Sequence, residues 1–122
     1  MSFTRMRTGK KGEDLAADYL IDAGFKIVER NYRCAFGEID FVAEEGETLV
    51  FVEVKSRRSE AYGSPQTAVG REKQRKLSRI ALHYLQEKRL GNRPARFDVV
   101  AVKLLPSGSR VELIRNAFDL SI

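Results

Sequence analysis

The sequence predicts a mixed α/β fold. Two segments repeat apolar residues at the spacing of an amphipathic helix, and other segments alternate or run apolar as strands do. Along the chain they follow the order α-β-β-β-α-β-β. The length of 122 residues is typical of one domain, so we expect a single domain over residues 1–122.

The first half of the chain predicts one helix and an antiparallel meander. Apolar residues recur at helical spacing over 9–23, and Gly24 is a typical C-terminal stop. Strand-like runs follow over 25–32, 37–44 and 48–55. Runs joined so closely pair as antiparallel neighbours.

The second half predicts a long loop, a helix and two closing strands. Residues 57–70 contain Gly and Pro without periodicity, which indicates a loop, and we interpret 62–65 as a flap on the substrate side. An apolar stripe predicts a helix over 71–88. Runs over 97–104 and 111–114 predict the last pair of strands.

The composition excludes several kinds of chemistry. One Cys, Cys34, and one His, His83, are too few for an internal disulfide, a Cys/His zinc site or the usual nucleophilic pairs. Any metal site must therefore use oxygen ligands, which suit Mg²⁺, Mn²⁺ or Ca²⁺. The net charge of +5 suits a polyanion such as nucleic acid. We expect neither a secretory signal nor a membrane span, and hence a cytoplasmic protein.

Two carboxylates are predicted to face each other across a hairpin. A two-residue turn at Gly46 and Glu47, or a four-residue turn around it, places Asp40 opposite Glu53. Facing carboxylates repel, so we expect a cation between them. Lys55 projects from the same face as Glu53, because side chains alternate along a strand, and it leaves room for a divalent ion.

A third carboxylate, Glu13, is predicted on the inward face of the first helix, whereas the aspartates of that helix gather on the solvent side. A buried, unpaired carboxylate is costly, so Glu13 needs a partner, and a site shared with Asp40, Glu53 and Lys55 supplies one. Other interpretations stay open. Glu13 can reach water from the helix edge or pair with Lys55, and Glu53 with Lys55 can be an ordinary surface ion pair.

Four stretches of the sequence resemble a known family. They are Gly12-Glu13, 37–40 (GEID), 51–57 (FVEVKSR) and 96–100 (RFDVV). Together they resemble the bacterial YraN family, which is similar to archaeal Holliday junction resolvases of the restriction-endonuclease-like, PD-(D/E)XK superfamily. The resemblance spans nearly the whole chain and implies a single endonuclease-like domain. Its α-β-β-β-α-β core would hold a mixed central sheet flanked by helices. Ile39 stands where the superfamily has proline.

The resemblance also implies a metal-dependent site. Asp40 and Glu53 would bind Mg²⁺ (or Mn²⁺) with the backbone carbonyl of Val54. Lys55 matches the motif lysine and would orient the attacking water or stabilise the charge that develops on the phosphate. Glu13 matches the helix acid of the resolvase-like branch and would complete the metal shell or help to hold a second ion.

Basic residues on the second helix and near the motif strand predict where nucleic acid would bind. The candidates are Lys10, Lys11, Arg57, Arg58, Arg71, Gln74, Arg75, Lys76 and Arg79. A solvated helix face explains any single one of them equally well, and a place at the edge of the core suits Gln74 better. We expect Asp98 to be a structural partner of a nearby arginine, and His83 to be exposed and inert.

These predictions favour a Mg²⁺-dependent endonuclease that hydrolyses phosphodiester bonds in branched or otherwise structured DNA. The alternative is a non-catalytic nucleic-acid-binding module of a DNA repair, recombination or uptake complex. A structural protein with a fortuitous ion cluster is a third interpretation. The acids and the lysine favour the enzyme, because acids near phosphates give a pure binder no advantage. The DNA structure cut, the number of metal ions and the oligomeric state, a homodimer included, stay open.

Overall fold

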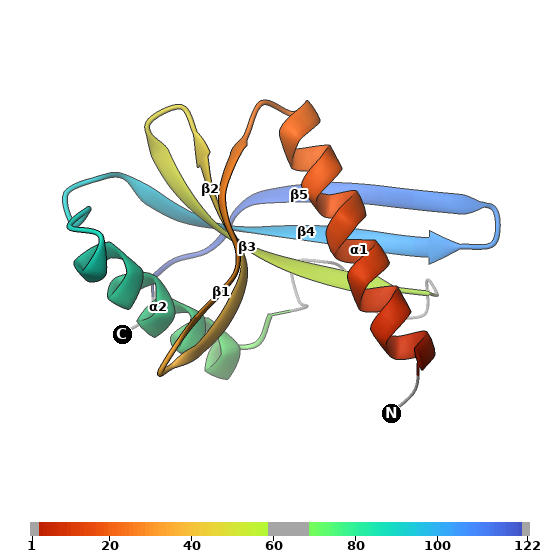
Figure 1. Cartoon of the computed structure of the whole chain (residues 1–122), viewed down its shortest axis with the longest axis horizontal. Helices are drawn as coiled ribbons and strands as arrows, with labels where there is room; N and C mark the ends of the chain where they lie inside the picture. The colour runs from red at the N-terminus through yellow and green to blue at the C-terminus, as the bar shows by residue number, and fades with distance from the viewer. Residues whose placement is uncertain (1–2, 59–68, 121–122) are drawn as a thin grey trace.

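A mixed sheet between two helices forms the fold, as seen in a computed structural model that describes residues 3–58 and 69–120. The elements are α1 (Phe3–Asp22), β1 (Lys26–Cys34), β2 (Gly37–Glu45), β3 (Thr48–Arg57), α2 (Arg71–Glu87), β4 (Ala95–Leu105) and β5 (Gly108–Phe118) (Figure 1). The predicted α-β-β-β-α-β-β order is confirmed. The flap expected at 62–65 lies outside the described residues.

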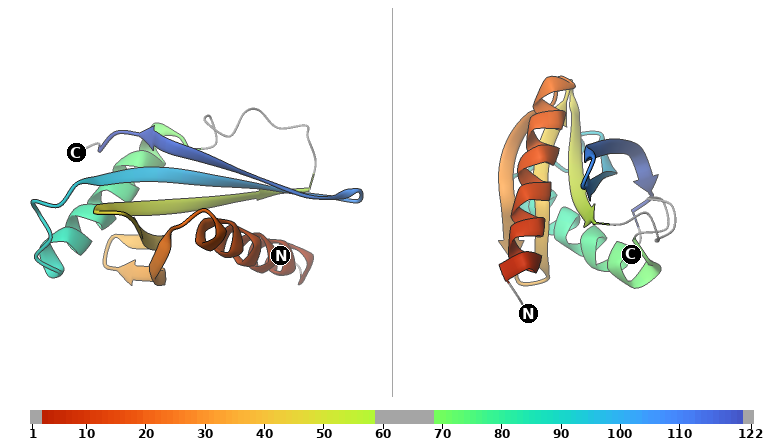
Figure 2. Two further views of the ribbon diagram at one scale, coloured as in Figure 1. Left: turned by 90° about the horizontal axis from the view of Figure 1, so that it is seen from above. Right: turned by 90° about the vertical axis from the view of Figure 1, so that its right-hand side faces the viewer.

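The five strands lie side by side in chain order. Neighbouring strands are antiparallel except β3 and β4, which run parallel and flank α2 in the sequence. α1 covers one face of the sheet and α2 covers the other (Figure 2). The prediction of a mixed central sheet flanked by helices is therefore confirmed.

Each helix closes a separate hydrophobic core. Ala16 and Leu20 of α1 pack with Phe41 and Val50 of the sheet, whereas α2 packs in the same way on the opposite face. The middle of β2 and of β3 is buried on both faces of the sheet, and there the sequence is continuously apolar, over 41–43 and 49–52. Tyr19 is one of the apolar residues that recur at helical spacing over 9–23, but it is 38% exposed, since it lies at the margin of the face that α1 turns to the sheet.

α1 ends where the sequence predicts but begins earlier. The Gly24 N–H donates to the Ile21 carbonyl and the Phe25 N–H to the Leu20 carbonyl, and Gly24 has a φ of +98°. This is a Schellman motif, whose left-handed residue is usually glycine. The helix starts at Phe3 rather than residue 9, because a single glycine costs a helix interior only about 1 kcal/mol and does not end it.

β5 is longer than the predicted run over 111–114. It is an edge strand with polar, exposed residues such as Arg110 and Glu112, and these hide its alternation. Beside it, Asp98 of β4 is fully buried and accepts hydrogen bonds from Arg96 Nε and the Asn116 N–H, each at 2.9 Å. The expectation that Asp98 is the structural partner of an arginine is confirmed.

Candidate active site

The predicted hairpin register is confirmed. Glu45 pairs with Thr48 across a two-residue turn, and the ladder continues as far as Phe41 and Val52. In this register Asp40 and Glu53 come next, at the point where the ladder stops although both strands continue. The Val54 N–H donates to Asp40 Oδ2 at 2.7 Å. The aspartate side chain thus accepts the hydrogen bond that the strand backbone would accept in a longer ladder.

The alternation of side chains between the two faces of the sheet is also interrupted in β2 at Asp40. Residues two apart in a regular strand share a face, yet Phe41 belongs to the core under α1 and Ile39 to the core under α2. In the neighbouring strand β1, the regular backbone is interrupted at the level of Asp40, where Asn31 has a φ of +54°. Asp40 therefore lies where the twisted hairpin passes from one face of the sheet to the other.

Asp40 and Glu53 form a tightly interacting carboxyl pair. Glu53 is only 6% exposed, and its negative charge acts on Asp40. Burial, followed by the negative charges of Glu53 and Glu13, raises the pKa of Asp40 to about 7, against the opposing effect of the Val54 N–H. Two neighbouring carboxylates repel each other, and a proton or a cation relieves this repulsion. The pair therefore holds a proton or requires a cation.

Glu13 approaches this pair from α1. It is half-buried, and its charge acts on Asp40. Its neighbour Gly12 lies so close to β3 that a methyl group there would come within 1.7 Å of Ser56 Oγ. Only glycine allows α1 to approach β3 so closely. The inward placement of Glu13 matches the expectation from the helical wheel.

Two lysines contact Glu53, and the sequence predicted only one of them. Lys55 Nζ lies 3.6 Å from Glu53 Oε2, and Lys73 Nζ lies 3.0 Å from the same oxygen. Lys73 was not among the candidates. A signal was present, since Lys73 stands four residues before the buried Leu77 and so belongs to the inward side of α2.

The other basic candidates are mostly at the surface. Arg57 is half-buried, and the exposed ones are Lys10, Lys11, Arg58, Arg71, Arg75, Lys76 and Arg79. Gln74 Nε2 donates to the Val69 carbonyl at 2.9 Å, which fits its interpretation as a residue at the edge of the core. The expectation that His83 is exposed was wrong, because the ring is half-buried and packs edge-on against Phe36, with 6.0 Å between the ring centroids.

The donor chemistry of the pair suits a hard divalent cation. Mg²⁺ prefers oxygen ligands and commonly takes one or two carboxylates, with water and phosphate oxygens completing its shell. Asp40 and Glu53 supply two carboxyls that already need positive charge between them. Over residues 3–58 and 69–120, no group of three or more His, Cys, Asp or Glu side chains could hold a metal ion. A site here would thus depend on the pair, water and substrate.

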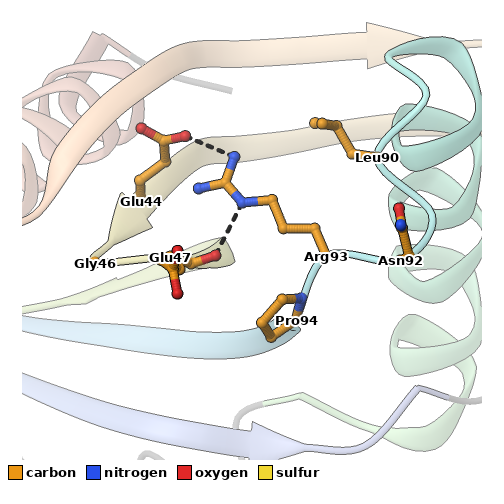
Figure 3. A pocket seen from close by; sticks show the side chains of 7 residues that line it. All are labelled: Glu44, Gly46, Glu47, Leu90, Asn92, Arg93 and Pro94. Atoms are coloured by element: carbon orange, nitrogen blue, oxygen red, sulfur yellow. Dashed lines mark hydrogen bonds and ion pairs between the residues drawn. The ribbon is translucent and has the colours of Figure 1, made fainter.

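A separate pocket of about 530 Å³ lies at the turn end of the same hairpin (Figure 3). Its main feature is Arg93, whose Nη1 lies 2.7 Å from Glu44 Oε2 and whose Nε donates to the Glu47 carbonyl at 2.9 Å. These contacts attach the segment before β4 to the turn between β2 and β3. We interpret them as structural.

The comparison with other proteins places the chain in a family. Residues 12–102 match the model of "Uncharacterised protein family UPF0102", and this stretch contains Glu13, Asp40, Glu53 and Lys55. A UPF0102 protein of Syntrophus aciditrophicus (strain SB) is 62% identical over 95% of this chain and 91% of its own. One of Geobacter sulfurreducens is 52% identical over 93% and 89%, respectively.

A feature of the helices and a comparison with solved structures complete this result. Neither helix in the described part of the chain is long and apolar enough to cross a membrane. Among solved structures, Pyrococcus furiosus SfsA in complex with Ca²⁺ is 17% identical, with a TM-score of 0.38 over 92% of this chain and 62% of that chain. A TM-score of this size does not establish a shared fold. The family model and the relatives do establish kinship, and the chain belongs to UPF0102, the family to which the YraN-like motifs pointed.

Proposed function

We propose that this protein is a metal-dependent nuclease that hydrolyses phosphodiester bonds in branched or otherwise structured DNA. The observation that carries the proposal is the meeting of Asp40 and Glu53 where the backbone ladder between β2 and β3 stops. A carboxyl pair in which Glu53 is buried and Asp40 half-buried is unfavourable for folding unless a proton or a cation compensates it. A cation bound by both carboxyl groups would compensate their charges.

Each residue of the cluster then has a chemical role. Asp40 and Glu53 would hold Mg²⁺ or Mn²⁺, with the Val54 carbonyl as a further oxygen ligand. When bound, the metal would polarise the phosphate and lower the pKa of a bound water molecule. Lys55, which Glu53 holds at 3.6 Å and which is 27% exposed, can orient the attacking water or stabilise the charge on the phosphate. Glu13 of α1 would complete the metal shell or help to hold a second ion.

The surface beside the cluster suits a DNA backbone. The ion pair between Lys73 and Glu53 shows that α2 begins next to the site. Arg71, Arg75 and Arg79 are exposed on the same helix. Cations along one helix can follow successive phosphates and gain affinity from the release of counterions.

The test is a cleavage panel of junction, flap, single-stranded and duplex DNA with Mg²⁺ or Mn²⁺. We expect the wild-type protein to cut at least one substrate. Lys55→Met should abolish cleavage and leave DNA affinity nearly unchanged, because the lysine acts most strongly as the phosphate reacts. Lys26→Met, at an exposed lysine of β1, is the matched control and should cut normally. The proposal fails if the metal-loaded protein cuts no substrate, or if Lys55→Met cuts at the wild-type rate.

A second candidate function is nucleic-acid binding without cleavage. One observation favours it, namely that the described residues include no group of three or more acidic, His or Cys side chains that could hold a metal ion. A module of this kind would bind the panel but leave every substrate intact. Its DNA affinity would not increase when Mg²⁺ is added, because Mg²⁺ would only compete with the basic side chains for the phosphates.

A further inference from the structure

We infer that Lys73 competes with the metal for Glu53 and must leave this carboxylate before a divalent ion can bind there. The inference rests on the proposed function, because it concerns the same site. Lys73 Nζ lies 3.0 Å from Glu53 Oε2, nearer than Lys55 Nζ at 3.6 Å. In the metal-free protein, Lys73 is thus the closer counterion of the buried acid.

The ammonium groups of Lys55 and Lys73 both lie beside the same carboxylate oxygen, Glu53 Oε2. The Glu53 side chain is 8% exposed, so little water is available to screen the charges around it. A divalent ion at this oxygen would meet two positive charges at contact distance. At least one lysine must therefore move away when the metal binds.

The structure favours Lys73 as the lysine that moves. The backbone of Lys55 is fixed inside the sheet, where it pairs with Ala101 of β4, and its side chain is 27% exposed. Lys73 comes from the first turn of α2, and its side chain is 44% exposed. Its ammonium can turn outward into solvent without any change in the sheet.

DNA would supply Lys73 with a new partner. A positive charge in the first turn of a helix is disfavoured by the helix dipole, so Lys73 needs an anion nearby. Glu53 serves in the free protein, and a phosphate beside the metal would serve in the complex. The exchange would couple metal binding to DNA binding, and Mn²⁺ alone would bind weakly.

The test measures Mn²⁺ binding to the full chain by calorimetry at pH 7.5 without DNA. Lys73→Met should bind Mn²⁺ about three- to tenfold more tightly than wild type. It removes a competing ion pair, and the free energy of such a pair corresponds to roughly this change in affinity. Lys73→Arg keeps the competing charge and should bind like wild type. Lys76→Met removes one charge from the same helix at an exposed position and controls for long-range electrostatics. Lys73→Gln repeats the test with a polar side chain, and circular dichroism confirms folding.

The outcomes separate this inference from the proposed function. Unchanged or weaker Mn²⁺ binding by both Lys73→Met and Lys73→Gln overturns the inference but leaves the metal site intact. Equal tightening in Lys73→Met and Lys76→Met also overturns it, because net charge alone would then explain the effect. Absence of Mn²⁺ binding in every variant and in wild type overturns the metal site of the proposed function together with the inference.

Discussion

Replacement of Asp40 by Asn should stabilise the metal-free protein at alkaline pH. Burial and the neighbouring acids raise the pKa of Asp40 from its ordinary 3.8 to about 7 in the folded protein. Folding therefore favours the protonated form. The stability that depends on this proton is fully present below pH 3.8, falls as the pH rises towards 7, and is lost above it. Asparagine resembles the protonated acid and can still accept the Val54 N–H.

The size of the effect follows from the two pKa values. One pH unit corresponds to about 1.36 kcal/mol, so the interval from 3.8 to about 7 sets an upper limit of roughly 4 kcal/mol. Asp40 is only half-buried, and water or a small movement of Glu53 relieves part of the repulsion. We expect Asp40→Asn to raise the free energy of unfolding by about 1–3 kcal/mol at pH 8.

Urea unfolding followed by circular dichroism, in EDTA at pH 4 and pH 8, measures this difference. Asp18→Asn, at an exposed position of α1, is the matched control and should change little at either pH. Saturating Mn²⁺ should then reverse the order, because it stabilises the wild-type protein and not Asp40→Asn. If Asp40→Asn is no more stable than wild type at pH 8 in EDTA, the carboxyl pair is not strained and our description of the site is wrong.

Three further predictions concern packing, buried charge and the DNA surface. Gly12→Ala should lower the free energy of unfolding in urea by about 1–3 kcal/mol, since its methyl group would collide with Ser56, and Ser56→Gly in the same chain should restore most of the loss. Arg96→Met should cost about 3–5 kcal/mol by leaving the buried Asp98 carboxylate without its arginine, and a thermal melt should show partial recovery when Asp98→Asn is added. Alanine at four arginines together should flatten the salt dependence of DNA binding measured by anisotropy, whereas an unchanged slope would place the DNA elsewhere. These four are Arg57, Arg58, Arg75 and Arg79.

The pairing of Asp40 with Glu53 could be predicted because the register of a hairpin follows from its turn. The two-residue turn at Gly46 and Glu47 fixes the opposite positions along both strands. The end of the ladder could not be predicted in this way. It depends on the twist of the β1–β2 hairpin, which shows in the left-handed backbone of Asn31 and in no local sequence pattern that we used.

Lys73 was missed because its contact depends on how α2 lies over the sheet. The helix and its apolar stripe follow from sequence periodicity, but periodicity does not determine where the helix lies along the sheet. Which turn of α2 reaches Glu53 is therefore a tertiary property. The sequence places Lys73 four residues before Leu77, but this spacing does not connect it with Glu53 on the preceding strand.

The site depends on the interruption of the sheet as much as on its acids. If the β2–β3 ladder continued past Phe41, the Val54 N–H would bond to the backbone of β2, and Asp40 would have no donor to hold its carboxyl group. Because β2 changes sides at Asp40, Glu13 on one helix and Lys73 on the other can act on the same carboxyl pair. A regular sheet would be more stable but would keep these two groups on opposite faces. The strained pair and the broken ladder are thus parts of one arrangement, and a substitution that relieves the strain should remove metal binding as it stabilises the fold.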